Sequence, residues 1–244
     1  IITIVDEAHN LPDWSREAAS ESLSADSLHR ASQESDKFGL LLADGSPPTL
    51  FLDLVESALK SLGEFHISDG DDEGLLPSHI VSPDSEVPTF ETEMMSLGKM
   101  TLYRLKQQSS DLSKMGQLIR QALLEKGKRP RSYIGSVGDF LCRWLDSIDS
   151  HTIRLVGNKP LRLEKVCLDP RVMTGFLGET AGVVMMSGTL SPLGMFRDIV
   201  GLKPDSKLKA FRSIFPKENR LVRYVSDVST SYKELNANPK VWVQ

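Results

Sequence analysis

The sequence predicts an α/β protein in which a parallel sheet is interrupted by a mainly α-helical insertion. Residues 1–5 and 183–186 are short apolar runs rich in Ile, Val and Met, of the kind that form buried parallel strands. Between them, residues 21–150 show mostly helical spacing of apolar side chains. We therefore expect two neighbouring strands that are far apart in the sequence, with a helical domain inserted between them.

The first half of the insertion is predicted to contain two helices and a long loop. One helix spans about 21–43, and a second begins at the Pro-Pro-Thr run 47–49 and stops at Gly63. Residues 64–93 contain no Lys or Arg, an acidic run and several prolines, which predicts an irregular loop.

The second half of the insertion is predicted to contain two more helices. A long helix capped by Thr89 or Thr92 reaches about Lys126, and a last helix carries an apolar face from Val137 to Ile148. Four amphipathic helices indicate a small bundle that buries its own core.

The pattern then changes to strands. Residues 152–156 and 161–166 read as a hairpin joined through a Gly-Asn-Lys-Pro turn, which we expect to return the chain to the parallel sheet. A helix should follow over 169–177, then the strand at 183–187 and a helix over 192–200.

From about residue 207 the chain is predicted to enter a second α/β domain, with a first strand at 221–225.

Two adjacent carboxylates follow the first predicted strand, in the tetrapeptide Asp6-Glu7-Ala8-His9. In open α/β sheets, functional groups gather just beyond the carboxyl ends of the strands. Asp6 can hold a hydrated Mg²⁺ that bridges nucleotide phosphates, and Glu7 can orient and deprotonate the attacking water. The alternative is a pair of solvated carboxylates in an ordinary strand-to-helix loop. The pattern predicts one half of a site that hydrolyses nucleoside triphosphates.

Small hydroxyl residues follow the second predicted strand, in the stretch Ser187-Gly188-Thr189-Leu190-Ser191-Pro192. They suit close backbone approach and a hydrogen-bond relay. Together with Val5-Asp6-Glu7-Ala8-His9-Asn10, this stretch resembles motifs III and II of the XPD helicase family, the iron–sulfur branch of superfamily 2 DNA helicases that also includes DinG. Weaker matches are Phe215-Pro216-Lys217-Glu218-Asn219-Arg220 and Val228-Ser229-Thr230-Ser231-Tyr232-Lys233.

The resemblance implies a division into domains. It implies a partial RecA-like P-loop NTPase sheet, interrupted by the family's helical Arch domain and followed by the start of a second RecA-like domain. On this basis residues 1–20 and 151–206 are predicted to belong to helicase domain 1. Residues 21–150 would form the Arch, and residues 207–244 would begin helicase domain 2.

The resemblance also implies a function. The parent protein would be an ATP-dependent helicase that moves 5′ to 3′ on single-stranded DNA in nucleotide excision repair, with repair or transcription-factor proteins as partners. ATP, Mg²⁺ and a 4Fe–4S cluster would be its cofactors. Asp6 and Glu7 would serve hydrolysis. Four residues would couple hydrolysis to strand movement: His9, Ser187, Gly188 and Thr189. The compact Arch and the tail look archaeal, which implies a cytoplasmic protein, or a nuclear one in a eukaryote.

Several parts of such an enzyme are absent from the 244 residues. No Gly-x-x-x-x-Gly-Lys-Ser/Thr phosphate loop occurs. The two cysteines, Cys142 and Cys167, cannot supply the roughly four thiolates that a cluster needs, and the resemblance places its ligands before motif II. We therefore interpret the chain as an internal piece of a longer protein and expect no ATP hydrolysis by this chain alone.

Overall composition indicates neither a basic nucleic-acid-binding protein nor a membrane-spanning one. The net charge of −4 gives no global basic field that would indicate nucleic-acid binding. No apolar run approaches the roughly 18 residues of a membrane span. Any contact with DNA must therefore come from local basic groups.

Two basic groups are candidates for contact with DNA phosphates. The first lies in the connection between the last two predicted helices and comprises Lys126, Lys128, Arg129 and Arg131. Its alternative role is to offset a helix dipole at a C-terminus. The second lies on the hairpin and comprises Arg154, Lys159, Arg162 and Lys165. Tyr133 and Trp144 could stack on bases, although Trp144 falls on a core stripe.

Two other interpretations stay open. A DinG-like helicase would keep the enzyme class but change the branch of the family. A non-catalytic module would use the insertion only to bind DNA or a protein partner. Charge reversal at Lys128, Arg129 and Arg131 separates DNA binding from protein binding, because only the first depends on these cations without a partner present.

Overall fold

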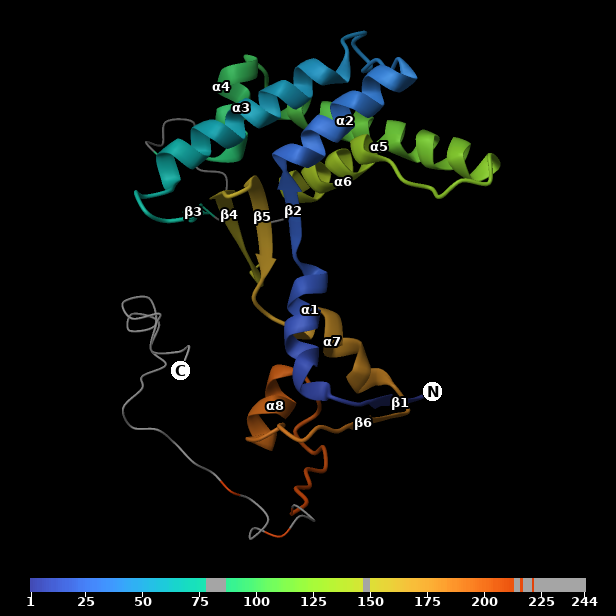
Figure 1. Ribbon diagram of the computed structural model, residues 1–244, viewed down its shortest axis with the longest axis vertical. Coiled ribbons are helices and arrows are strands. Elements are labelled where there is room, and N and C mark those ends of the chain that lie inside the picture. The colour runs from blue at the N-terminus through green and yellow to red at the C-terminus, as the bar shows by residue number, and fades with distance from the viewer. Residues whose placement is uncertain (78–86, 147–149, 213–215, 217–220, 222–244) are drawn as a thin grey trace. The chain divides into compact units, whose positions relative to one another are not determined.

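The computed structural model describes residues 1–77, 87–146, 150–212, 216 and 221 (Figure 1). The chain divides into two compact units, residues 1–206 and 207–244. The predicted strand at 221–225 and the weaker motif matches at 215–220 and 228–233 fall outside the described residues, apart from Pro216 and Leu221. The predicted domain boundaries stay a prediction.

The parallel sheet in the first unit joins the two ends of that unit. Strands β1 (Ile2–Val5) and β6 (Gly182–Met185) pair in parallel, with Ile2 opposite Gly182 and Val5 opposite Met185. The predicted fold class is confirmed: an α/β protein with a parallel pair of strands and an insertion between them.

Short helices flank the parallel strands. After β1 come the 3-10 turn η1 (Ala8–Asn10) and α1 (Leu11–Ala19). Before β6 come α7 (Arg171–Thr174) and the 3-10 turn η2 (Gly175–Glu179), and α8 (Leu193–Ile199) follows β6.

The described part of the insertion contains five helices rather than the four predicted. Their bounds are α2 (Ala25–Phe38), α3 (Pro48–His66), α4 (Phe90–Gly98), α5 (Leu102–Glu125) and α6 (Tyr133–Asp146). The single long helix predicted from 89 or 92 to 126 was wrong. Lys99 adopts left-handed backbone angles that end α4, and the Thr101 side chain accepts a hydrogen bond from Arg104 N–H that starts α5.

A separate four-stranded antiparallel sheet lies in the insertion. It consists of β2 (Glu21–Ser24), β3 (Glu73–Leu76), β4 (Thr152–Asn158) and β5 (Leu161–Cys167), in the order β2-β5-β4-β3. The hairpin was predicted correctly, but the prediction that it returns to the parallel sheet was wrong, because β5 pairs with β2 and β4 pairs with β3.

Two other sequence predictions fail at this sheet. The helix predicted over 21–43 begins only at Ala25, because the Ser24 side chain accepts from Ser27 N–H and caps it, which leaves residues 21–24 as a strand. The loop predicted over 64–93 contains the last turn of α3, strand β3 and the start of α4. Its residues 78–86 lie outside the described part of the chain.

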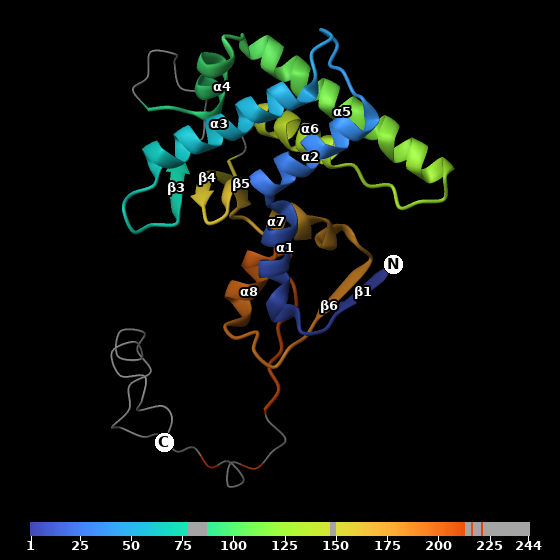
Figure 2. The ribbon, with the colours of Figure 1, turned by 45° about the horizontal axis from the view of Figure 1, so that its top comes forward.

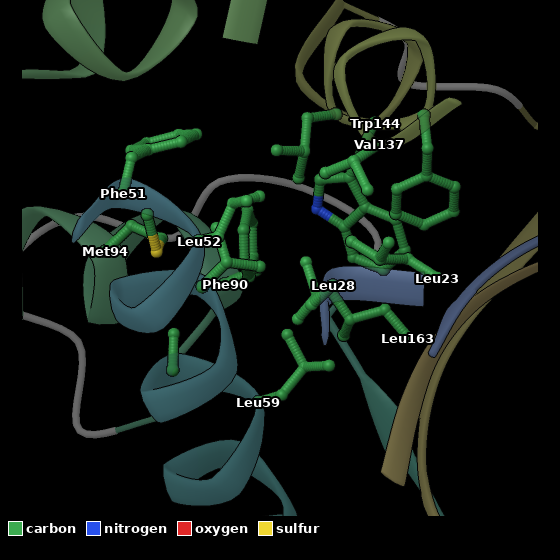
Figure 3. Close-up of a cluster of buried hydrophobic side chains, with 14 of the residues drawn as sticks. Leu23, Leu28, Phe51, Leu52, Leu59, Phe90, Met94, Val137, Trp144 and Leu163 are labelled. Carbon is green, nitrogen blue, oxygen red and sulfur yellow. The ribbon is translucent and has the colours of Figure 1, made fainter. Parts of the chain in front are cut away.

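One hydrophobic cluster joins the helices to this sheet (Figure 3). The cluster includes Phe51 and Leu59 of α3, Leu28 of α2, Trp144 of α6 and Leu163 of β5. Helix α3 packs across β3, β4 and β5. The predicted bundle therefore buries its core partly against strands that the sequence pattern assigned elsewhere.

Helices α5 and α6 approach each other through glycines. A Cβ atom built on Gly116 would overlap Gly135 Cα, and one built on Gly138 would overlap the backbone of Ser113. In α3, by contrast, a Cβ on Gly63 would meet its nearest neighbours at an ordinary 3.8 Å.

We predict that Gly116→Ala lowers the free energy of unfolding by about 1–3 kcal/mol, because the added methyl group must push two helix backbones apart. The matched control, Gly63→Ala, should raise it by about 0.5–1 kcal/mol, since alanine favours a helix and has room here. Urea denaturation of both variants measures the difference. Equal effects of the two substitutions would contradict the close packing of α5 on α6.

Candidate functional site

The parallel pairing of β1 with β6 brings the two sequence motifs to the same sheet end. Met186 N–H donates to Val5 C=O at 3.0 Å, and Ala8 N–H donates to Met186 C=O at 3.1 Å. These bonds continue the pairing beyond the last strand residues. Residues 6–9 and 187–189 therefore emerge side by side, as the position of each motif at a strand end predicted.

Glu7 has a backbone conformation that the sequence did not reveal. Its φ of 47° and ψ of 41° are left-handed, which is uncommon for a residue other than glycine and costs on the order of 1 kcal/mol. This turn reverses the chain between β1 and η1. Asp6 Oδ1 accepts a hydrogen bond from Glu7 N–H at 2.8 Å, which fixes the Asp6 carboxylate at the turn.

The hydroxyl group of Ser187 is the centre of the site. Ser187 Oγ donates to Glu7 Oε2 at 3.1 Å and lies 2.7 Å from His9 Nδ1. Thr189 N–H donates to the same Oγ at 3.3 Å. His9 Nδ1 is also 3.2 Å from Glu7 Oε2. Two of the four predicted coupling residues, His9 and Ser187, thus contact the predicted catalytic Glu7, and a third, Thr189, contacts Ser187.

Counting protons defines the state of His9. Ser187 has one hydroxyl hydrogen, and it is used in the bond to Glu7. With its hydrogen on Glu7, Ser187 Oγ accepts from His9, an arrangement that predicts a proton on His9 Nδ1. The nearby Glu7 carboxylate oxygen favours the same arrangement, because it too needs a donor.

Gly188 occupies an open turn. A Cβ atom at this position would meet nothing within 4 Å. No described neighbour therefore requires glycine here, and a coupling role for Gly188 stays a prediction.

The residues present fit a magnesium ion in part. Mg²⁺ prefers oxygen ligands, keeps several waters and is bound through one or two carboxylates plus substrate phosphates. The exposed carboxylate of Asp6, held by Glu7 N–H, suits that role. No cluster of three or more His, Cys, Asp or Glu side chains in the described ranges could hold a metal ion without such phosphates.

The cysteines do not fit an iron–sulfur cluster. Cys142 lies on α6 and Cys167 ends β5, and both are free thiols. Burial raises the pKa of the Cys142 thiol, which disfavours the thiolate that a metal needs. A cluster held by residues outside this chain stays a prediction.

A larger cavity of about 900 Å³ lies elsewhere in the first unit, between α1, residues 168–171 and α8. None of the motif residues lines it. Charged residues that line this cavity interact with one another. Hydrogen bonds from Arg171 lower the pKa of the Asp169 carboxyl to about 2, and His151 Nδ1 lies 3.3 Å from Asp169 Oδ2. The motif site is therefore the better candidate for chemistry.

The structure corrects the predicted DNA contact of Arg154. Its side chain is 7% exposed and pairs with Glu91 at 3.0 Å. It also donates to the Trp144 carbonyl oxygen and lies over the Trp144 ring. A phosphate cannot reach a guanidinium enclosed in this way. Trp144 itself is buried, as its place on a core stripe predicted.

Arg162 is also engaged within the insertion. It bridges Glu73 on β3 and Glu164 on its own strand, the latter at 2.6 Å. The four basic residues of the loop between α5 and α6 are all exposed: Lys126, Lys128, Arg129 and Arg131. Their contact with DNA stays a prediction. Sequence reasoning missed Arg30 and Phe38, which line one groove with Leu123 and Tyr133, the residues on either side of this loop in the sequence.

Among the described helices, none is long and apolar enough to cross a membrane.

Comparison with known proteins found a matching family model and similar solved structures. A family model described as "Helical and beta-bridge domain" matches residues 54–234. Two solved structures, named "XPD_Helicase" and "XPD_APO", are similar to this chain at 23% and 20% sequence identity, each with a TM-score of 0.48. Each match covers 82% of this chain but only 29% and 32% of the solved chain. The chain thus spans about a third of the length of the structures it matches.

We predict that the neutral ring of His9 carries its proton on Nδ1, since Ser187 Oγ and Glu7 Oε2 are both acceptors there. A ¹⁵N NMR correlation spectrum measures the tautomer, with His9→Gln to assign the signal. Glu7→Ala should weaken the preference, whereas Asp13→Ala on α1 should not. A proton found mainly on Nε2 in the unaltered chain would rule out this hydrogen-bond arrangement.

Proposed function

Because the chain belongs to the helical and beta-bridge domain family, we propose that it is one part of an ATP-dependent DNA helicase of the XPD type. The observation that carries the proposal is the convergence of Glu7 and His9 from one motif on Ser187 from the other. A structural loop would need neither two adjacent carboxylates at a strand end nor a hydroxyl group shared with the second motif.

Asp6 and Glu7 would perform separate tasks in hydrolysis. Mg²⁺ with ATP, when bound, supplies the phosphoryl group and charge stabilisation on its oxygens. Asp6 would hold the hydrated ion through its exposed carboxylate. Glu7 would orient a water molecule and accept its proton, with its own carboxylate aligned by the Ser187 hydroxyl. The phosphate loop would be supplied by other sequence.

Ser187 would pass the state of Glu7 to the rest of the second motif. When Glu7 accepts a proton, it becomes a poorer acceptor for the Ser187 hydroxyl hydrogen, and His9 or Thr189 must take up the change. The effect reaches the Thr189 backbone through its N–H bond to Ser187 Oγ. A short hydrogen-bond chain of this kind can link nucleotide state to the surface that holds DNA.

The resemblance supports three further parts of the proposal. They are movement 5′ to 3′ on single-stranded DNA, a role in nucleotide excision repair, and a 4Fe–4S cluster held outside this chain. Strand displacement from duplexes with a 5′ tail or a 3′ tail tests the direction. Unwinding of only the 3′-tailed duplex would show that the protein moves 3′ to 5′ instead.

Glu7→Gln in the whole protein is predicted to lower DNA-stimulated ATP hydrolysis about 100- to 10,000-fold, because an amide cannot accept the proton of water. DNA binding should be retained. The control is Glu17→Gln on α1, which carries the same change on an exposed side chain outside the site. Unchanged hydrolysis in Glu7→Gln would refute the role of Glu7. DNA-stimulated ATP hydrolysis by the 244-residue chain alone would refute the expectation that this chain lacks the part of the site that holds the nucleotide phosphates.

Ser187→Ala in the whole protein is predicted to lower unwinding more than hydrolysis, because it removes the link between Glu7 and His9 but leaves both carboxylates in place. The measured quantity is the number of base pairs separated for each ATP consumed. Ser206→Ala, outside the site, is the control. An unaltered ratio in Ser187→Ala would show that coupling does not pass through this hydroxyl group.

A further inference from the structure

A groove of about 450 Å³ is lined by residues of α2, the end of α5 and the start of α6. Figure 2 shows the course of these three helices. We call it the α2–α5 groove and define it by the residues that line it: Arg30, Gln33, Glu34, Lys37, Phe38, Leu123 and Tyr133. It combines aromatic rings with cations. The loop 126–131 leaves from one of its walls and returns to the other, because Leu123 and Tyr133 flank that loop in the sequence.

Two aromatic rings of the α2–α5 groove are partly exposed, and a cation of α2 lies over one face of each: Arg30 is 5.5 Å from the centre of the Tyr133 ring, and Lys37 is 5.8 Å from the centre of the Phe38 ring. Tyr133 is 39% exposed and Phe38 is 42% exposed. Arg30 Nη1 donates to the Tyr133 hydroxyl oxygen at 3.1 Å, and Asp26 holds Arg30 at 2.9 Å. The ring of Tyr133 is therefore fixed in position while part of it faces solvent.

The loop 126–131 supplies cations at a fixed place on the groove edge. The side chains of Lys126, Lys128, Arg129 and Arg131 are exposed, and none makes an ion pair with a described residue. Lys128 N–H donates to Leu123 C=O at 2.9 Å, which ties the loop to the end of α5.

Glu34 ties the other end of the loop to α2. Its Oε2 accepts from Ser132 Oγ and from Ile134 N–H, both at 2.8 Å. Two acidic groups at the groove are thus used: Glu34 caps α6, and Asp26 pairs with Arg30. The four loop cations keep their charge for a ligand.

We propose that the α2–α5 groove binds single-stranded nucleic acid. Phosphates would lie on the loop 126–131, and a base would stack against Tyr133 or Phe38. Grooves that combine a basic track with exposed aromatic rings bind single strands in this way, without reading the sequence. An acidic peptide would use the cations but not the π-faces. The choice of nucleic acid rests on the proposed helicase function, whereas the site itself rests on these contacts.

Binding of a fluorescein-labelled ten-nucleotide oligo-dT to the 244-residue chain, without nucleotide or Mg²⁺, tests the proposal by fluorescence anisotropy. The double variant Lys128→Glu/Arg129→Glu should weaken binding at least about tenfold, because it reverses two of the four phosphate contacts. The matched control Lys60→Glu/Lys99→Glu reverses two exposed lysines of α3 and the α4–α5 connection and should bind normally. With four phosphate contacts, affinity of the unaltered chain should fall about 50-fold between 50 and 200 mM salt.

The aromatic part of the α2–α5 groove is tested separately. Tyr133→Ala should weaken oligo-dT binding about 5- to 30-fold, whereas Tyr133→Phe should bind normally because it keeps the ring. Thermal melting followed by circular dichroism checks that each variant folds. If Tyr133→Ala is unfolded, Phe38→Ala on the exposed end of α2 takes its place.

Three results would overturn the proposal. The first is unchanged binding after reversal of the loop charges. The second is equal binding of duplex DNA with no effect of either aromatic substitution, which would mean backbone contact alone. The third is equally tight binding of poly-glutamate, which would identify an acidic protein segment as the partner. Because no ATP is present, each of these results leaves the Glu7 experiment unaffected, and loss of the Glu7 role would leave oligo-dT binding intact.

Discussion

The parallel pairing of β1 with β6 is the constraint on which the rest of the structure depends. It places His9 and Ser187, which are 178 positions apart, within 2.7 Å of each other. The segment between β1 and β6 must leave the first strand and return to the second without disrupting their pairing. The chain solves this by pairing its outgoing strand β2 with its returning strand β5, and Cys167 N–H donates to Ser20 Oγ at the base of the pair. An insertion whose two ends are side by side can fold around its own core.

The insertion keeps its parts in place with one buried ion pair as well as with apolar packing. Arg154 on β4 pairs with Glu91 on α4 and donates to the carbonyl oxygen of Trp144 on α6, so a single guanidinium joins three elements. A buried pair of this kind adds little net stability, because desolvation offsets its attraction, but loss of one partner is costly. Glu91 Oε2 and Trp144 Nε1 have no described hydrogen-bond partner, which makes the geometry around Arg154 more demanding still.

Some basic side chains of the insertion form internal ion pairs, which leaves fewer of them to bind an anionic partner. Arg154 and Arg162 belong to the sheet of the insertion, and their carboxylate partners neutralise them. The cations of the loop 126–131 have no such partners among the described residues. The cations of the sheet are therefore paired within the insertion, whereas the cations of the loop 126–131 are exposed. The two sequence motifs meet at the strand ends of β1 and β6, whereas the exposed cations without a described partner lie in the loop between α5 and α6.

The sequence by itself determined which residues could carry chemistry and which faces had to be buried. The tetrapeptide at the end of β1, the Ser-Gly-Thr stretch after β6 and the burial of Trp144 were all predictable, because residue type and spacing report strand ends and buried faces. Only the tertiary structure decided that residues 21–24 form a strand, that Lys99 divides α4 from α5, and that Arg154 is internal. It also decided the left-handed turn at Glu7 and the sharing of one hydroxyl group by Glu7 and His9. The physical reason is that a linear pattern shows that a side chain needs a partner, whereas the partner itself lies on an element brought near only by folding.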